Sequence, residues 1–339
     1  MTRFSLGIWG NTVREMADLA VQAEAAGFET IWAHELHRSP IVPITVAASQ
    51  TSRIGLGTGV QLAFTRSPLV MALTALDLDE LSGGRFKLGL GTGVKRLNES
   101  WHGVNFGSPV KHLRETVEAI QTLVSGAHLG KPISYPGEYY NLDVRGFRRP
   151  WAPVRDIVPI YLAAVGPRMS RLAGSHGDGW IGHELNSRKW VEDVILPNIA
   201  SGLRESGRDR RRFDVVLTVC CAVNESRQKA IRQAAGSVAF YATVRTYHEF
   251  FASSGFGDEA TRIGQLFREG NTEAMLEAVP EEMVHTFAVA GTAAEVRSRL
   301  KDLADLGDEL HLSPPHTFLS GEEITGNLQS IIALVDGWS

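Results

Sequence analysis

One six-residue segment, Gly-Leu-Gly-Thr-Gly-Val, occurs twice in this chain, at 55–60 and at 89–94. Each copy ends a run of strand-like residues, and a helix is predicted between them over 69–81. Strands that alternate with helices form parallel sheets, because a parallel pair needs a long crossover between its strands. The two copies should therefore lie at the carboxyl edge of one sheet, on successive strands.

The rest of the chain continues this alternation of strands and helices. Strands are predicted over 3–9, 29–34, 53–60, 85–91, 159–165, 178–182, 213–223 and 308–313. Helices are predicted from a cap at Asn11 or Thr12 to Ala26, and over 44–49, 69–81, 111–125, 167–176, 188–206, 225–238 and 322–335. Eight strand–helix units favour a closed barrel over an open sheet. The predicted fold class is therefore α/β, as a (β/α)8 TIM barrel with insertions.

Two stretches interrupt the alternation, at about 127–157 and at about 240–290. The first is rich in Gly, Pro, Tyr and Arg, and the second is mostly helical in pattern. Neither resembles a linker, so we expect a single domain over 1–339 with two insertions. Long insertions in compact domains are commonly lids or partner surfaces. Aromatic residues of the second insertion fit either a lid or a subunit interface: Phe240, Tyr241, Tyr247, Phe250 and Phe251.

Composition excludes several classes of protein. With 34 Lys plus Arg against 38 Asp plus Glu, the net charge of −4 gives no basic surplus for nucleic acid. No apolar run approaches the ~18 residues of a membrane span, and Met1–Trp9 does not resemble a signal peptide, so we expect a cytoplasmic protein. The adjacent Cys220 and Cys221 are expected to be apolar strand residues without a disulfide, and no metal site is expected.

The glycine repeats do not match the known phosphate-binding fingerprints. Neither copy has the third glycine of Gly-x-Gly-x-x-Gly, and no Gly-Lys-Ser/Thr follows. Two interpretations stay open. Small residues let strands meet helices at barrel corners, or they let a flat ligand approach the backbone at the strand ends.

Other candidate site residues also follow predicted strands. At 163–169 a strand runs through Gly166 into a helix that starts at Pro167, where free N–H groups suit a phosphate and Arg168 adds a charge; the alternative is an ordinary strand-to-helix turn. After the second strand, Glu35 or a flanking histidine is a candidate proton donor or hydrogen-bond partner for a ring, although a surface loop fits equally. His183-Glu184 has an equivalent position after the sixth strand, and His311 and His316 are weaker candidates.

The chain resembles the luciferase-like monooxygenase superfamily. The matching segments are RIGLGTGV at 53–60, FTRSPLV at 64–70, LDELSGGRFKLGLGTG at 78–93, PGEYY at 136–140, PIYLAAVGPRM at 159–169 and DGW at 178–180. Within the superfamily it is most similar to the branch that depends on the deazaflavin coenzyme F420, of the methylenetetrahydromethanopterin reductase type.

The resemblance implies a (β/α)8 barrel with the cofactor at the carboxyl ends of the strands. It implies a non-prolyl cis peptide bond at Gly59–Val60 behind the deazaflavin ring, and a cofactor phosphate near the turn after the fifth strand. The cofactor-binding residues implied are Gly59, Val60, Gln61, Gly91, Thr92, Gly93, Ala164, Val165, Gly166, Pro167 and Arg168.

The same resemblance makes Glu35, His34 and His37 the candidate catalytic residues. Some enzymes of the F420 branch have an Asp-His pair at the end of the second strand. If Glu35 takes the Asp place, Leu36 takes the His place, and His34 and His37 flank the pair. The chain departs from the family pattern at this point.

The leading functional hypothesis is hydride transfer between F420 and a small organic substrate. The alternative is a two-component monooxygenase that uses reduced FMN from a partner flavin reductase, and a third is a barrel that only binds a ligand. The resemblance also implies a homo-oligomer, a dimer or larger.

Overall fold

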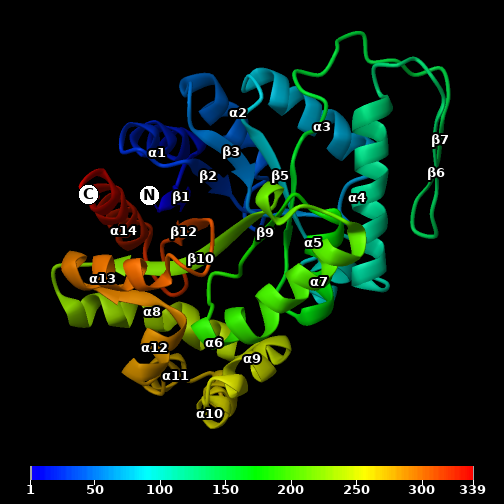
Figure 1. Ribbon diagram of the computed structural model, residues 1–339. Coiled ribbons are helices and arrows are strands. Elements are labelled where there is room, and N and C mark those ends of the chain that lie inside the picture. The colour runs from blue at the N-terminus through cyan, green and yellow to red at the C-terminus, as the bar shows by residue number, and fades with distance from the viewer. Residues whose placement is uncertain (1, 339) are drawn as a thin grey trace.

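The computed structural model describes residues 2–338 and shows a closed barrel of parallel strands (Figure 1). The barrel strands are β1 (Arg3–Gly7), β2 (Thr30–Ala33), β3 (Gly55–Thr58), β5 (Phe86–Gly91), β8 (Ile160–Ala163), β9 (Gly179–Ile181), β10 (Asp214–Val223) and β12 (Glu309–Ser313). Each strand pairs in parallel with its neighbour, and β9–β10, β10–β12 and β12–β1 pairings close the circle. The predicted α/β fold, a (β/α)8 TIM barrel, is confirmed with all eight strands.

Helices surround the barrel as the alternation predicts. They are α1 (Val13–Ala25), α2 (Ile41–Gln50), α3 (Pro68–Leu81), α4 (Pro109–Gly126), α5 (Pro167–His176), α6 (Arg188–Trp190), α7 (Leu196–Ser206), α8 (Arg227–Ala242), α13 (Ala293–Leu303) and α14 (Gly321–Asp336). Thr12 caps α1, because its hydroxyl accepts from the Glu15 N–H at 3.1 Å. The helix predicted over 188–206 is wrong as one regular helix: a π-helical segment, Val191–Ile195, separates α6 from α7.

The two insertions have different structures. The first contains a hairpin of β6 (Ile133–Pro136) and β7 (Asn141–Val144), which projects beside α4 in Figure 1. The second contains α9 (His248–Ser253), α10 (Gly257–Arg268), α11 (Thr272–Glu277) and α12 (Glu281–Phe287), which form one helical cluster. It leads into β11 (Val289–Gly291), which pairs with β10. Phe250 and Phe251 are buried against Phe287, so they form the core of this cluster rather than an exposed interface.

A small apolar cluster fills the barrel interior, separate from the main core between sheet and helices. It consists of Trp32, Tyr161, Ile181 and Val216, with Val60 packed against it. The repeated glycines face this cluster. A Cβ at Gly57 would lie 2.3 Å from the Trp32 ring, and a Cβ at Gly89 would lie 1.9 Å from the carbonyl oxygen of Thr58. These two glycines therefore make room for protein atoms inside the barrel.

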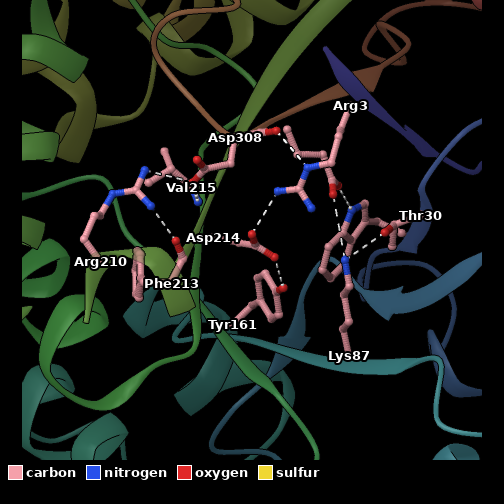
Figure 2. A network of polar contacts seen from close by, with 11 residues as sticks. Arg3, Thr30, Lys87, Tyr161, Arg210, Phe213, Asp214, Val215 and Asp308 are labelled. Atoms are coloured by element: carbon pink, nitrogen blue, oxygen red, sulfur yellow. Dashed lines mark hydrogen bonds and ion pairs between the residues drawn. The ribbon is translucent and has the colours of Figure 1, made fainter. Parts of the chain in front are cut away.

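Polar side chains fill the amino-terminal end of the barrel (Figure 2). Arg3 donates to Asp214 at 2.9 Å, and the Tyr161 hydroxyl donates to the other oxygen of that carboxylate at 2.5 Å. Beside them the Lys87 ammonium donates to the Thr30 hydroxyl at 2.9 Å. A network of this kind closes one end of the barrel, and chemistry is expected at the other end, where the repeats finish.

Two further expectations concern the chain as a whole. Cys220 and Cys221 are both buried and free of a disulfide, as predicted. Within residues 2–338, every helix is too short or too polar to cross a membrane.

Candidate active site at the carboxyl end of the barrel

The segment after β3 carries an unusual backbone feature. The Gly59–Val60 peptide bond is cis, which confirms the expectation from the family resemblance. The Gly59 N–H donates to the Ala33 carbonyl at 2.8 Å, and the Glu35 N–H donates to the Val60 carbonyl at 3.0 Å. These bonds hold Gly59 and Val60 against the end of β2, at the mouth of the barrel.

Gln61 follows Val60 and begins β4 (Gln61–Leu62), a two-residue strand beside β5. Its side chain is buried, and neither the amide nitrogen nor the amide oxygen has a hydrogen-bond partner among the described residues. An unpaired buried amide is costly, so it marks a place where a polar ligand or water is expected. Gln61 thus offers one donor group and one acceptor at the mouth.

The loop after β5 is held by a residue that the sequence did not reveal. The Asn98 amide nitrogen donates to the carbonyls of Thr92 at 2.8 Å and Val94 at 3.0 Å. Gly93 in this loop has φ +60°, a conformation that favours glycine. Asn98 lies in a short π-helical segment, Leu97–Trp101, and no sequence pattern linked it to the loop.

Glu35 is committed to contacts with its own chain. Its carboxylate accepts two hydrogen bonds from Arg66, at 2.6 and 2.9 Å, and one from the Leu62 N–H at 2.8 Å. A carboxylate held in this way orients the segment after β3, because bidentate pairs with arginine have a fixed geometry. The geometry favours a positioning role for Glu35 over the predicted role as a proton donor, which stays untested.

His34, the neighbour of Glu35, faces the mouth instead. Its ring stacks on the ring of His316 with centroids 6.0 Å apart. The side chain is exposed to solvent by area, yet the surrounding protein and the nearby His316 lower its pKa to about 4. His37 is exposed beyond it and contributes to lowering the pKa of His34.

Glu184, just after β9, lies beside His316 in the same group of side chains. Its side chain is only 9% exposed, and its nearest ionic partner is His316, whose Nδ1 lies 3.7 Å from a carboxylate oxygen. No hydrogen bond of normal geometry reaches either oxygen from the described residues. Burial, the Glu184 charge and a weak hydrogen bond to Glu184 raise the pKa of the Tyr241 phenol well above its ordinary value. The barrel thus joins His34, Glu184 and His316, which come from three strand ends.

The turn after β8 presents an open helix N-terminus. Gly166 is the N-cap of α5, and nothing lies within 4 Å of the position that a Cβ would take there. Carbonyls of Ala164 and Val165 are fixed by the Trp180 and Trp190 indoles at 2.9 and 2.8 Å. Pro167 starts the helix and Arg168 is exposed beside it. Free N–H groups at a helix N-terminus favour an anion. The predicted phosphate position at this turn stays a prediction.

Comparison of the whole sequence with known families identifies the family of this chain. The family model of the luciferase-like monooxygenases matches residues 3–310. The chain belongs to the luciferase-like monooxygenase family.

Relatives of the chain include reductases. The chain is 30% identical to the 5,10-methylenetetrahydromethanopterin reductase of Archaeoglobus fulgidus, over 84% of each protein. It is 28% identical to a putative coenzyme F420-dependent oxidoreductase of Mycobacterium tuberculosis, over 87% of this chain and 89% of the relative. The structure of the coenzyme F420-dependent tetrahydromethanopterin reductase from Methanopyrus kandleri superposes with a TM-score of 0.83, at 24% identity, over 98% of this chain and 99% of the other.

Two cavities of this luciferase-like barrel lie away from the mouth. One, of about 700 Å³, is lined by Val124, Asp178 and Arg208 at the amino-terminal ends of the strands. The other, of about 570 Å³, lies outside the barrel between β10 and the helices α12 and α13. Neither is lined by the residues of the candidate site.

His311 of β12 packs against Trp32 inside the luciferase-like barrel. Its burial should make the stability of the protein depend on pH. It is buried, and burial lowers its pKa to about 3, whereas an unfolded histidine titrates near 6.5. Below pH 6.5 the unfolded state binds a proton that the folded state does not, so stability falls as pH decreases. This one group can lower the free energy of unfolding by at most about 1.4 kcal/mol for each pH unit.

His311→Gln should therefore make the fall in unfolding free energy between pH 6 and pH 5 shallower by up to about 1.4 kcal/mol per pH unit. Urea unfolding at several pH values measures this slope. The exposed His102→Gln serves as the matched control and should leave the slope unchanged. Equal slopes for wild type and His311→Gln would contradict the prediction.

Proposed function

We propose that this protein is an F420-dependent oxidoreductase that transfers a hydride between coenzyme F420 and a small organic substrate. The observation that carries the proposal is the set of buried polar groups without partners at the barrel mouth, in a chain whose relatives at 28–30% identity include a putative coenzyme F420-dependent oxidoreductase. These groups lie where ligands of (β/α)8 barrels bind, at the carboxyl ends of the strands.

The residues of the mouth fit a deazaflavin cofactor. A flavin-like ring has carbonyl and N–H groups along one edge, and the unpartnered Gln61 amide offers both complementary groups. The phosphate of the tail would be held at the N-terminus of α5, where Gly166 leaves open space and Arg168 adds positive charge. Gly91 ends the neighbouring β5, Thr92 and Gly93 follow it, and these residues would contact the ring or tail.

When bound, F420 supplies a carbon that gives or accepts a hydride; the protein binds, orients and excludes water. Val60 backs the site from the apolar cluster inside the barrel. Glu35 holds the segment after β3 in place through Arg66. His34 stays neutral at pH 7, since its pKa is about 4, so its ring can donate or accept one hydrogen bond without carrying charge.

The second candidate is a monooxygenase that uses reduced FMN from a partner flavin reductase. The family description favours it, because the family is that of luciferase-like monooxygenases. The two candidates share the fold and differ in the cofactor that binds. A product that forms only with FMN, a reductase and oxygen would support this alternative.

Arg168 provides a test of the phosphate position. Arg168→Ala should weaken F420 binding about tenfold, because it removes a charge-assisted contact worth about 1.4 kcal/mol. Arg171 lies on the same helix, but it pairs with Glu205 of α7 at the outside of the barrel. Arg171→Ala is the matched control and should bind F420 within about twofold of wild type. Quenching of F420 fluorescence measures both, and equal losses would place the phosphate elsewhere.

A further inference from the structure

The Glu184 carboxylate is the group at the mouth that the proposed cofactor contacts leave unused. It is 9% exposed, neither oxygen accepts a hydrogen bond of normal geometry from the described residues, and the Tyr241 hydroxyl beside it is a weak donor. A buried carboxylate is destabilising unless it is paired. An unpaired one that lies in a candidate active site points to a donor group that comes from outside the chain.

Other buried carboxylates of this protein show what a structural role looks like here. Asp79 is held by Arg155 at 2.6 Å, and Glu35 by Arg66 at 2.6 Å. Glu184 has neither an arginine nor a lysine within ion-pair distance among residues 2–338; its only charged contact is the His316 ring at 3.7 Å. Asp79 and Glu35 thus each have an arginine partner, whereas Glu184 has none.

Aromatic rings surround this carboxylate. The Tyr241 and Tyr247 rings lie 5.2 Å apart, and both pack on the ring of His183, at 4.3 and 4.7 Å. Burial and the Glu184 charge raise the pKa of both phenols, so both hydroxyls stay protonated near it. A carboxylate beside aromatic faces is a favourable environment for an organic cation.

We propose that Glu184 recognises the substrate of this enzyme, by accepting hydrogen bonds from a cationic or N–H-bearing nitrogen group. Two free oxygens suit a group with two parallel N–H donors, such as an amidinium. Tyr241, near the end of α8, and Tyr247, just before α9, lie where the second insertion leaves the barrel. This assignment rests on the proposed function, since it places Glu184 on the side of the mouth where the substrate of that reaction would bind.

The test compares two fragments of equal shape that differ in charge. Benzamidinium and benzamide are titrated by calorimetry into the full-length protein, both free and loaded with F420. Wild type should bind benzamidinium at least tenfold more tightly than benzamide. Glu184→Gln should abolish this preference. Glu205→Gln removes the same charge from the outer surface and should keep it. A wild type without preference, or a preference that survives in Glu184→Gln, would overturn the proposal.

Stability gives a second readout that separates recognition from a structural role. Glu184→Gln removes an unpaired buried charge, so its melting temperature should equal or exceed that of wild type. A fall of several degrees would show that Glu184 stabilises the fold and would overturn the proposal. F420 affinity should stay within about twofold in this variant. Failure of wild type to bind F420, with the amidinium preference intact, would count against the proposed cofactor and leave Glu184 as a recognition group.

Discussion

Replacing Gly89 by alanine is expected to prevent stable folding of the barrel. The added Cβ would lie 1.9 Å from the Thr58 carbonyl oxygen and 2.9 Å from the Ile181 side chain. The Thr58 hydroxyl also bonds both the N–H and the carbonyl of Gly89, at 2.9 and 2.8 Å, so β3 and β5 are held in close contact there. Overpacking typically costs about 1–3 kcal/mol, and a clash with backbone should exceed about 3 kcal/mol.

Urea unfolding of Gly89→Ala measures this loss, with Gly326→Ala as the control. Gly326 lies in α14, and nothing lies within 4 Å of the position that its Cβ would take, so alanine there should stabilise by about 0.5–1 kcal/mol. A Gly89→Ala protein as stable as wild type would show that the strands can separate at this point without cost.

The second large effect is expected at Lys87, inside the amino-terminal end of the barrel. The Glu309 carboxylate is fully buried there, 3.8 Å from the Lys87 ammonium, and it also accepts from the Trp32 indole at 3.4 Å. Lys87→Met leaves this carboxylate without its cation. Removal of one partner of a buried pair costs about 3–5 kcal/mol, so the unfolding free energy should fall by about that amount.

A double-mutant cycle shows whether the pairing causes the loss. Glu309→Gln in the Lys87→Met background removes the stranded charge and should restore at least half of the lost stability. Lys189→Met removes an exposed lysine that pairs with Asp193 and should leave stability close to that of wild type. Additive effects of the two barrel substitutions would contradict the interpretation as a buried pair.

The glycine repeat shows what the sequence could and could not predict. Its two copies correctly marked the ends of β3 and β5 and so the open edge of the barrel. Glycines at alternate positions share one face of a strand, but the sequence does not say what that face meets. In the structure Gly57 and Gly89 meet Trp32 and Thr58, so packing explains them, whereas Gly166 faces open space as a ligand position would.

The side chains of the mouth were less predictable because their partners are distant in sequence. Glu35 was a candidate acid, but Arg66, 31 residues later, holds its carboxylate. Glu184 and His316 were separate weak candidates, and only closure of the barrel through β9, β10 and β12 brings them together. Strand and helix positions follow from local patterns, whereas hydrogen-bond partners depend on the tertiary fold.

The central claim is that this barrel binds a deazaflavin rather than FMN. Titration of the purified protein with F420, followed by quenching of F420 fluorescence, tests it directly beside a parallel titration with FMN. We expect saturable binding of F420 at one site per chain, at least tenfold tighter than binding of FMN. Saturable binding of FMN with no binding of F420 would contradict the claim.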